Sequence, residues 1–228
     1  YDLAFLQQVR SRPVWQSLQI LDAGANQGLF LSKNESADFF KSINLRVPTI
    51  YKRPQDGQGT MILKEDRGHG SINQYVVKDC DSASRYWNDL KQPFLQEFVK
   101  GIEYTIDIFS SEDYQTINCC PRIRRKVRAG VSDVGEVHLN PDLMDLLLAK
   151  LPLFKLRGPW NLQCILRDSE FYFLEVNPRF SGGIPLSIEA GCDLVQNLVE
   201  WYLGEPLTKF GKLKDGLIMM KYEQELFV

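Results

Sequence analysis

The chain has 228 residues, of which 44% are hydrophobic and 25% are charged, and its formal net charge is −2. This balance is typical of a soluble globular protein with one large domain or two small lobes. It argues against wholesale binding to nucleic acid or to an anionic membrane, and no apolar run approaches the roughly 20 residues of a membrane span.

The five cysteines are scattered apart from the adjacent Cys119 and Cys120, and no C-x-x-C pair occurs. The two histidines are also far apart, so the spacing favours neither a zinc site nor a disulfide framework. The first residues, YDLAFLQQVR, lack the basic start and long apolar run of a signal peptide. We therefore expect free thiols and a cytoplasmic protein.

The first half of the chain alternates short apolar runs with turns rich in glycine, proline and aspartate. The apolar runs predict five strands, at residues 46–51, 61–64, 72–77, 93–99 and 102–110. Two helices are expected among them. One covers residues 34–43 and is capped by Asn34 or Ser36; the other covers residues 81–90 and is capped by Asp81.

The second half begins with a basic strand at residues 119–130 and a helix at residues 141–151. A hairpin of strands 160–166 and 170–176 follows, then a helical stretch over residues 185–204 and a last strand over residues 216–228. Strands and helices are mixed without a strict β-α-β alternation. The predicted fold class is therefore α+β rather than doubly wound.

The stretch FLEVNPRFSGG, residues 173–183, starts as a strand and ends in a glycine-containing turn. Residues two apart on a strand share a face, so Glu175 and Asn177 aim two oxygen ligands in one direction. Mg²⁺ takes a few oxygen ligands from protein and completes its shell with phosphate and water. Arg179 could reach a phosphate with its forked donors. The alternative is a solvated strand end with a turn.

Gln163, on the preceding strand, could supply a third oxygen ligand if it lies on the same face. Directly opposite residues of a hairpin share a face, and a two-residue loop at 168–169 would pair Gln163 with Leu174. A three-residue loop or a bulge at 168–170 would pair Gln163 with Glu175. We expect the second register; the alternative is a glutamine simply exposed on a strand.

The same register predicts that Arg167 lies opposite Phe171. It also divides the second strand of the hairpin into two faces. Phe171 and Phe173 are expected on the side of Glu175, where Phe173 could keep water from bound phosphates. The residues expected to face the following helix are Tyr172, Leu174 and Val176.

The stretch MILKEDRGHGS places Lys64 at the end of an apolar strand, before a turn that contains Gly68, Gly70 and Ser71. Glycines let backbone N–H groups approach an anion, and a lysine adds a point charge, so this stretch predicts a phosphate site. An ordinary hairpin turn is the alternative. Lys52, in the polar loop KRPQDGQG, is a rival for the same role. We prefer Lys64 because an apolar strand leads directly into it.

In LQEFVKGIEYTIDIF, the strand end Glu97–Phe98–Val99 could offer backbone groups to an adenine edge, and Glu103 could accept hydrogen bonds from ribose hydroxyls. The alternative is two amphipathic strands of a half-buried sheet. The basic stretch RIRRKVRAG puts four positive side chains on one face by alternation, which could line an anionic substrate cleft or form a solvated face. These four are Arg122, Arg124, Lys126 and Arg128.

In their order and spacing these motifs resemble the ATP-grasp superfamily, and most closely its carbamoyl-phosphate-synthase large-subunit-like branch. The resemblance spans residues 31–228, and a glutamine at position 163 is like that branch. The segments that carry it are LSKNESADFF, MILKEDRGHGS, LQEFVKGIEYTIDIF, GPWNLQCIL, FLEVNPRFSGGIPLSIEAGCDLVQNLVEWYLG and the final strand.

The resemblance implies roles for individual residues. Glu97 and the backbone of Val99 would meet the adenine, and Glu103 would bind the ribose. The residues implied to bind ATP as a whole are Lys33, Lys64, Gly68, Gly70, Ser71, Glu97, Phe98, Val99 and Glu103. Those implied to hold Mg²⁺, or Mn²⁺ in its place, are Gln163, Glu175 and Asn177. Those implied to contact the transferred phosphoryl group or the substrate are Arg179, Lys126 and Arg128.

The resemblance also implies an ATP-grasp fold, in which two α+β lobes clasp a nucleotide. Residues 31–94 would form the small lobe and residues 95–228 the large lobe with the metal site. Residues 1–30 would be the remnant of an N-terminal pre-grasp domain that is largely absent.

The implied activity is Mg-ATP-dependent ligation, in which a carboxylate is activated as an acylphosphate and attacked by an amine or a similar nucleophile. The expected partners are small-molecule carboxylates and amines, not nucleic acid or membrane, and both a homodimer and a partner subunit stay open. One alternative is a non-catalytic nucleotide-binding module or a subunit of a larger synthetase. Another is a nucleic-acid-binding domain built on the arginine-rich strand.

Overall fold

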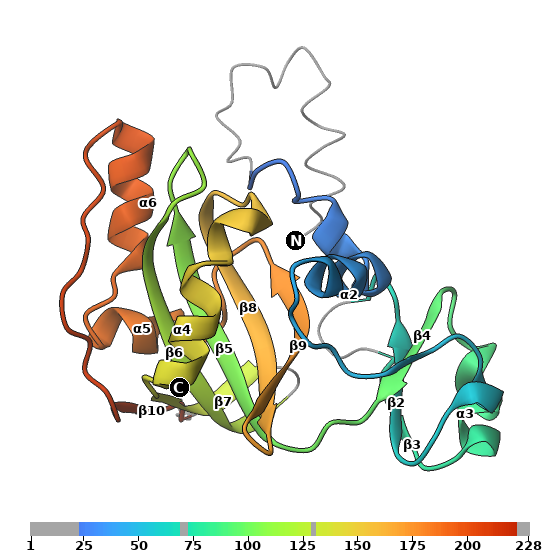
Figure 1. Cartoon of the computed structure of the whole chain (residues 1–228). Helices are drawn as coiled ribbons and strands as arrows, with labels where there is room; N and C mark the ends of the chain where they lie inside the picture. The colour runs from blue at the N-terminus through green and yellow to red at the C-terminus, as the bar shows by residue number, and fades with distance from the viewer. Residues whose placement is uncertain (1–22, 69–72, 129–130, 223–228) are drawn as a thin grey trace, which may run out of the picture.

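The computed structural model describes residues 23–68, 73–128 and 131–222. Their backbone forms two antiparallel sheets that lie side by side (Figure 1). The smaller sheet has four strands in the order β1-β4-β2-β3 and is covered by helix α3 (Cys80–Trp87). Its strands are β1 (Ile50–Tyr51), β2 (Met61–Glu65), β3 (Tyr75–Val77) and β4 (Pro93–Glu97). Strands and helices thus combine in the expected α+β class.

The larger sheet has six strands in the order β10-β7-β6-β5-β8-β9. The long neighbours β5, β6 and β8 form its centre, and the pairing of β5 with β8 joins segments far apart in the sequence. Its strands are β5 (Ile102–Ser110), β6 (Thr116–Arg128), β7 (Val131–Val137), β8 (Gly158–Arg167), β9 (Glu170–Asn177) and β10 (Ile218–Met220).

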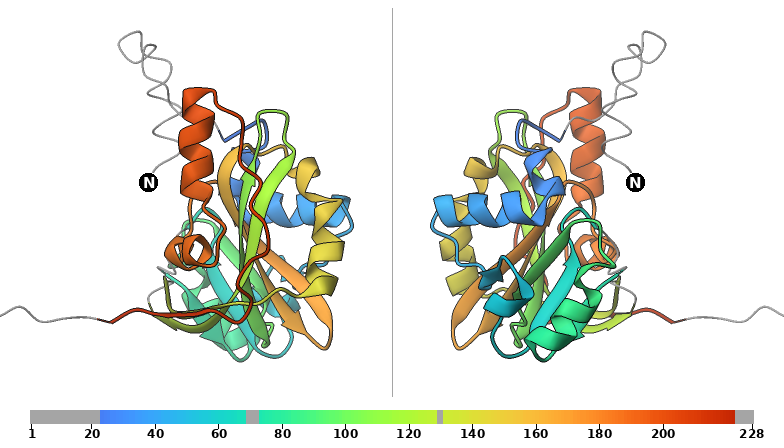
Figure 2. Two further views of the ribbon diagram at one scale, coloured as in Figure 1. Left: turned by 90° about the vertical axis from the view of Figure 1, so that its left-hand side faces the viewer. Right: turned by 90° about the vertical axis from the view of Figure 1, so that its right-hand side faces the viewer.

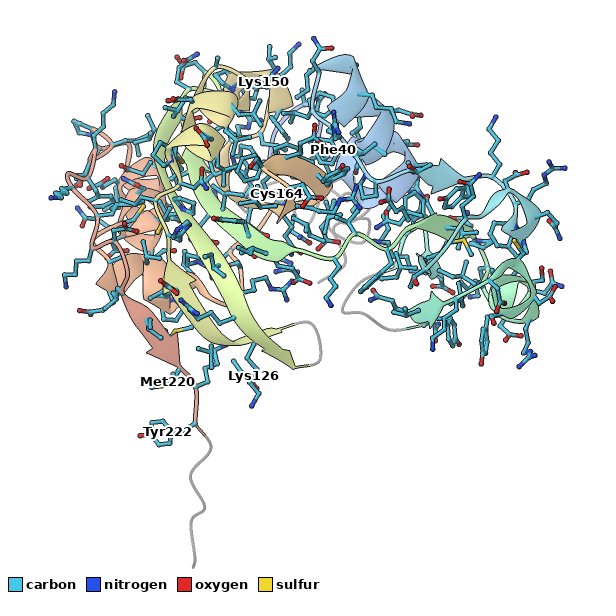
Figure 3. All side chains as sticks on the ribbon, turned by 60° about the horizontal axis from the view of Figure 1, so that its bottom comes forward. Phe40, Lys126, Lys150, Cys164, Met220 and Tyr222 are labelled. Carbon is cyan, nitrogen blue, oxygen red and sulfur yellow. The ribbon has the colours of Figure 1, made fainter. Side chains whose placement is uncertain are left out.

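Helices cover both faces of the larger sheet (Figure 2). On one face, α2 (Lys33–Ser42) and α4 (Pro141–Leu148) enclose the main apolar core, where Phe40 and Cys164 are fully buried (Figure 3). On the other face, α5 (Ile184–Glu189) and α6 (Leu194–Leu203) enclose a second core. Helix α2 therefore packs on the larger sheet, whereas β4 belongs to the smaller one.

Side chains just before the first two helices fix where they start. Ser32 caps α2 by accepting a hydrogen bond from the Glu35 N–H at 3.2 Å, so the cap is neither of the two residues expected. Asp79 caps α3 by accepting from the Ser82 N–H at 2.7 Å, two residues before the predicted cap. Both corrections have one cause: several short polar residues precede each helix, and any of them can accept such a bond.

The predicted helical stretch at 185–204 is two helices, α5 and α6. Gly191 lies between them with φ +96°, a conformation that glycine adopts without strain, and Asp193 then caps α6. Strand β7 was not predicted, because the residues that form it carry no regular apolar alternation. Residues 223–228 of the last predicted strand lie outside the described residues, and β10 covers three residues of that stretch.

The β8–β9 hairpin has the predicted pairing of Gln163 with Glu175, but a different cause produces it. Its loop has two residues, both with positive φ, so Arg167 pairs with Glu170 rather than with Phe171. The register shift lies further along, where Glu175 pairs with Gln163 and Phe173 pairs with Cys164, which leaves Leu174 as the extra residue of a bulge.

This bulge also reverses the predicted faces of the β9 residues that precede Glu175, whereas Val176 stays on the face opposite Glu175. Phe171 and Phe173 pack into the main core with Phe40, away from the side that Glu175 faces. Tyr172 instead clusters with Val99, Ile165 and Leu174. A bulge turns two successive residues toward one side, so alternation counted from Glu175 assigns every earlier residue to the wrong face.

Candidate nucleotide site

A cavity of about 400 Å³ lies between the two sheets. Its walls come from β2 and β4 of the smaller sheet, from the segment that joins the lobes, and from β5, β6, β8 and β9 of the larger sheet. The lining residues are Lys33, Ile62, Lys64, Glu65, Gly68, Gln74, Gln96, Glu97, Phe98, Val99, Lys100, Gly101, Glu103, Arg124, Gln163, Ile165, Leu174, Glu175, Asn177 and Arg179. Most of the predicted site residues are therefore brought to one space.

The predicted metal ligands lie together at one end of this cavity. Gln163 and Glu175 are direct cross-strand neighbours, and Asn161 and Asn177 form the next such pair. The amide of Asn177 donates to Glu175 Oε1 at 3.1 Å. These contacts bring one carboxylate and two amide oxygens to the same wall, as the sequence predicts.

Two arginines contact these oxygen atoms. Arg124 donates from Nη1 to Glu103 Oε2 at 3.2 Å and to Gln163 Oε1 at 3.4 Å. Arg179 donates from Nη2 to Asn177 Oδ1 at 3.4 Å. Arg179 was predicted as a site residue, whereas Arg124 was placed only among the basic residues of its strand. Strand alternation on the basic segment was the signal for Arg124.

The loop that follows β9 rests on a buried ion pair. Arg122 donates from Nε to Asp107 Oδ2 at 2.7 Å, and both side chains are almost fully buried. The same guanidinium donates to Ser181 Oγ at 2.7 Å, and a Cβ on Gly183 would come within 2.3 Å of its Nη1. Alternation had suggested that Arg122 could line a substrate cleft. It instead supports the loop that carries Arg179.

Lys64 lies on the wall contributed by β2, and burial lowers its pKa to about 8. Glu175 opposes this shift and Lys33 adds to it. A cation that has lost much of its hydration gains strongly from an anionic ligand, so the site favours phosphate at this position. Lys52, the rival, is exposed and does not line the cavity.

Lys33 is held by the start of the glycine-containing loop. Its ammonium donates to the carbonyl oxygens of Glu65, Asp66 and Gly68 at 2.9, 2.9 and 2.7 Å. A lysine has three N–H donors, so these bonds match its full capacity. Burial also lowers the pKa of Lys33, against the attraction of Glu175, Asp66 and Glu65. In this arrangement Lys33 fixes the base of the loop, whose residues Gly70 and Ser71 lie outside the described residues.

The other end of the cavity is apolar and lies beside the segment that joins the lobes. Val99 packs with Ile165, Tyr172 and Leu174, and Ile62 contributes from β2. These apolar residues were not predicted as site residues, except for Val99. A flat, weakly polar surface of this kind suits an aromatic base.

The carboxylate of Glu97 is held by polar side chains beside this apolar end. It accepts hydrogen bonds from Arg167 and from the N–H and hydroxyl of Thr49, and it is ion-paired with Arg167. Burial raises the pKa of Glu97, but these hydrogen bonds outweigh burial and lower it overall. Glu97 can therefore offer its backbone to a ligand, while its side chain ties the lobes together. Phe98 is partly exposed beside it.

One residue predicted on the basic strand, Lys126, is not brought to the cavity. Lys126 is exposed, and Figure 3 shows its side chain pointing outward near Met220. Register shifts between Arg124 and Val127 break the strict alternation that predicted one shared basic face. The side chain of Arg128 lies outside the described part of the chain.

The oxygen donors of the cavity fit a hard cation that shares its coordination with phosphate. Within the described residues, no group of three His, Cys, Asp or Glu could hold a metal by itself. One carboxylate and two amides leave room for the phosphate and water ligands that Mg²⁺ prefers. None of the described helices has the length and hydropathy to span a membrane, and all five cysteines are free thiols.

Comparison with protein families gives a match over more than half of the chain. The family described as "ATP-grasp in the biosynthetic pathway with Ter operon" matches residues 89–225. Among curated proteins, "Multifunctional protein URA2" of Saccharomyces cerevisiae is 32% identical over 96 residues. That alignment covers 39% of this chain and 4% of the yeast protein.

Solved structures with a similar fold include three enzymes of low sequence identity. N5-carboxyaminoimidazole synthetase from Staphylococcus aureus, complexed with ADP, has a TM-score of 0.71 at 13% identity, over 88% of this chain and 59% of that one. The biotin carboxylase domain of 2-oxoglutarate carboxylase from Hydrogenobacter thermophilus was solved in complex with MgADP, ADP and bicarbonate. It has a TM-score of 0.70 at 12% identity, over 84% of this chain and 49% of that one. D-alanine–D-alanine ligase from Bacillus anthracis has a TM-score of 0.60 at 17% identity, over 84% of this chain and 74% of that one.

These identities establish a common fold alone. The chain spans about half the length of the first two structures.

Proposed function

The chain belongs to the family described as "ATP-grasp in the biosynthetic pathway with Ter operon". On that premise we propose that it is the nucleotide-binding part of an ATP- and Mg²⁺-dependent ligase. The ligase activates a carboxylate as an acylphosphate, which an amine or a similar nucleophile then attacks. The observation that carries the proposal is the shared cavity. Gln163, Glu175 and Asn177 line the same space as Lys64, and this space continues to an apolar wall beside Val99.

The two ends of the cavity suit the two ends of ATP. The apolar surface of Val99, Ile165 and Leu174 binds the adenine, and backbone groups of Glu97 and Val99 meet its edge. Glu103 lies between the two ends and binds the ribose. Structures of similar fold were solved with ADP or MgADP, which supports a nucleotide in this fold.

The phosphate end supplies positive charge to the reaction. Gln163, Glu175 and Asn177 hold Mg²⁺, which neutralises phosphate charge, while Lys64 and Arg179 contact phosphate oxygens. An oxygen of the substrate carboxylate attacks the γ-phosphorus, the bond to the β,γ-bridging oxygen breaks, and ADP leaves. The amine then attacks the acyl carbon and phosphate leaves. The work of the protein is positioning and charge neutralisation, because phosphoryl transfer needs little covalent catalysis.

The match to the yeast protein URA2 supports a finer assignment to the carbamoyl-phosphate-synthase-like branch, as does Gln163. The alternative is a nucleotide-binding module without catalysis. The retained Glu175, Asn177 and Lys64 argue for catalysis.

Trapping the acylphosphate tests the proposal. Panels of carboxylates are incubated with Mg-ATP and hydroxylamine, which converts an acylphosphate to a hydroxamate that can be measured. We expect ADP and hydroxamate in equal amounts with one class of carboxylate, and neither product with the Glu175→Gln variant. Thermal stabilisation by Mg-ATP without ADP release in any panel would support the non-catalytic module. No stabilisation by Mg-ATP would contradict nucleotide binding itself.

A further inference from the structure

Each candidate metal ligand already accepts a hydrogen bond from a side chain in the same wall. Gln163 Oε1 accepts from Arg124, Asn177 Oδ1 accepts from Arg179, and Glu175 Oε1 accepts from the Asn177 amide. Two of these three donors are arginines. The positive charge of the guanidinium groups thus lies where the proposed function places a divalent cation.

A metal ion should bind only weakly here while both arginines keep these positions. A guanidinium within hydrogen-bond distance of a ligand oxygen repels an incoming Mg²⁺ and uses one of the two lone pairs of that oxygen. The triphosphate changes this balance, because its oxygen atoms are stronger partners for arginine than an amide carbonyl is. Metal can therefore bind tightly at this site together with nucleotide, although it binds weakly alone.

Arg124 is tethered in a way that allows such an exchange. Its Nη1 donates to Glu103 Oε2 at 3.2 Å as well as to Gln163 at 3.4 Å. Its side chain is mostly buried at the cavity wall, and Glu103 keeps it there when the bond to Gln163 breaks. Arg179 is exposed on the loop after Asn177 and is held by the Phe180 carbonyl at 3.0 Å.

We propose that Arg124 and Arg179 act as stand-in cations that block the metal site until the phosphates of a nucleotide draw them away. This inference rests on the proposed function, because it assigns a binding order to the same site. Free divalent metal binds weakly, and nucleotide and metal bind with strong positive coupling. Such coupling is reciprocal, so each ligand raises the affinity for the other by the same factor.

Electron paramagnetic resonance of Mn²⁺ measures the metal affinity with and without nucleotide. Mn²⁺ serves as the probe, and the nucleotide is a non-hydrolysable ATP analogue. For the Arg124→Met variant without nucleotide we expect Mn²⁺ to bind about tenfold tighter, the effect of removing about 1.4 kcal/mol of repulsion. The coupling between Mn²⁺ and the analogue should fall by a similar factor, and Arg124→Lys should restore part of it.

Arg125→Met is the matched control. Arg125 lies on the same strand, pairs with Glu136, is exposed and does not line the cavity, so its loss removes the same charge at a distance from the ligands. Mn²⁺ affinity without nucleotide should stay within about twofold of the wild type. Equal gains in Arg124→Met and Arg125→Met would overturn the proposal, because they would show only a change in net charge.

The Glu175→Gln variant separates this inference from the proposed function. Loss of Mn²⁺ binding in the presence of the analogue supports the metal site itself. If that loss occurs but Arg124→Met leaves Mn²⁺ affinity and coupling unchanged, the metal site stands and the stand-in role of Arg124 is wrong. If Glu175→Gln changes nothing, the metal site of the proposed function fails and this inference fails with it. Thermal unfolding of each variant checks that it is folded.

Discussion

The two ends of the cavity between the lobes are built in different ways. At the end proposed to bind phosphate, polar side chains from several strands converge: Gln163 from β8, Glu175 and Asn177 from β9, and Lys64 from β2. At the other end, apolar side chains form a surface and the backbone of the joining segment supplies the polar groups. We therefore expect binding at the first end to depend on the identity of single residues, and binding at the second to depend on shape and apolar area.

A loss of the carboxylate at the phosphate end should have the largest effect. Glu175→Gln keeps the size of the side chain but removes the only negative charge among the three candidate ligands. We expect the enhancement of ATP binding by Mg²⁺ to fall more than about 100-fold, above the 10–100-fold typical of residues that only orient metal ligands. Isothermal titration of ATP with and without Mg²⁺ measures this, and an unchanged enhancement would contradict the metal site.

This difference explains what could be predicted from the sequence. Side-chain chemistry is visible in sequence, so the convergence of Gln163 and Glu175 was predicted. Lys64, which we prefer over Lys52 for the phosphate role, lines the cavity, whereas Lys52 does not. The apolar surface was not predicted apart from Val99, because Ile165 and Leu174 look like ordinary strand residues. Only the bulge at Leu174 turns that side chain to the cavity side.

Prediction of the fold from the sequence meets the same limit, because local patterns do not show tertiary contacts. Strand β5 was predicted with its full bounds because its alternation is regular, yet both of its faces are buried. Asp107 lies under the loop after β9 and pairs with Arg122, and no local pattern indicates that a charged residue of this strand meets an arginine of the next. Irregularities such as the bulges in β6 and β9 depend on tertiary packing and shift every residue counted across them.

Lys64 offers the second test of the comparison. Lys64→Met should weaken ATP binding by about 10–100-fold, since a hydrogen bond to a charged group contributes about 1.5–3 kcal/mol. The loss should grow from AMP to ADP to ATP, because the ammonium contacts phosphate. Lys52→Met, an exposed lysine of the same lobe, should bind all three nucleotides like the wild type. Equal losses for the two variants would show that Lys64 acts only through net charge.

The pH dependence of ATP binding follows from the pKa of Lys64, which is about 8 in the folded chain against an ordinary value of 10.5. Phosphate prefers the protonated amine, so affinity should fall as pH rises through about 8, and Lys64→Met should lack this fall. The effect on folding has the opposite sign. The unfolded chain holds this proton up to about 10.5, so the cost of a buried ammonium is present below pH 8 and shrinks as pH rises from 8 to 10.5.

Competitive titration of a fluorescent ATP analogue across this pH range measures how ATP affinity changes with pH. Chemical denaturation measures how folding stability changes over the same range. A wild-type affinity that is flat between about pH 7 and about pH 9 would contradict a phosphate contact by Lys64.

The smallest effect is expected at the apolar end. Leu174→Ala removes part of the surface that it shares with Val99 and Ile165, and loss of about 1 kcal/mol of apolar contact should weaken ATP binding by roughly fivefold. Because the contact is to the base, the loss should be the same for adenosine, AMP, ADP and ATP. Leu203→Ala, on the exposed surface of α6, is the matched control and should bind all four ligands normally. A loss from Leu174→Ala that grows with the number of phosphates would show that the two ends of the cavity are not independent, and the adenine would have to be placed elsewhere.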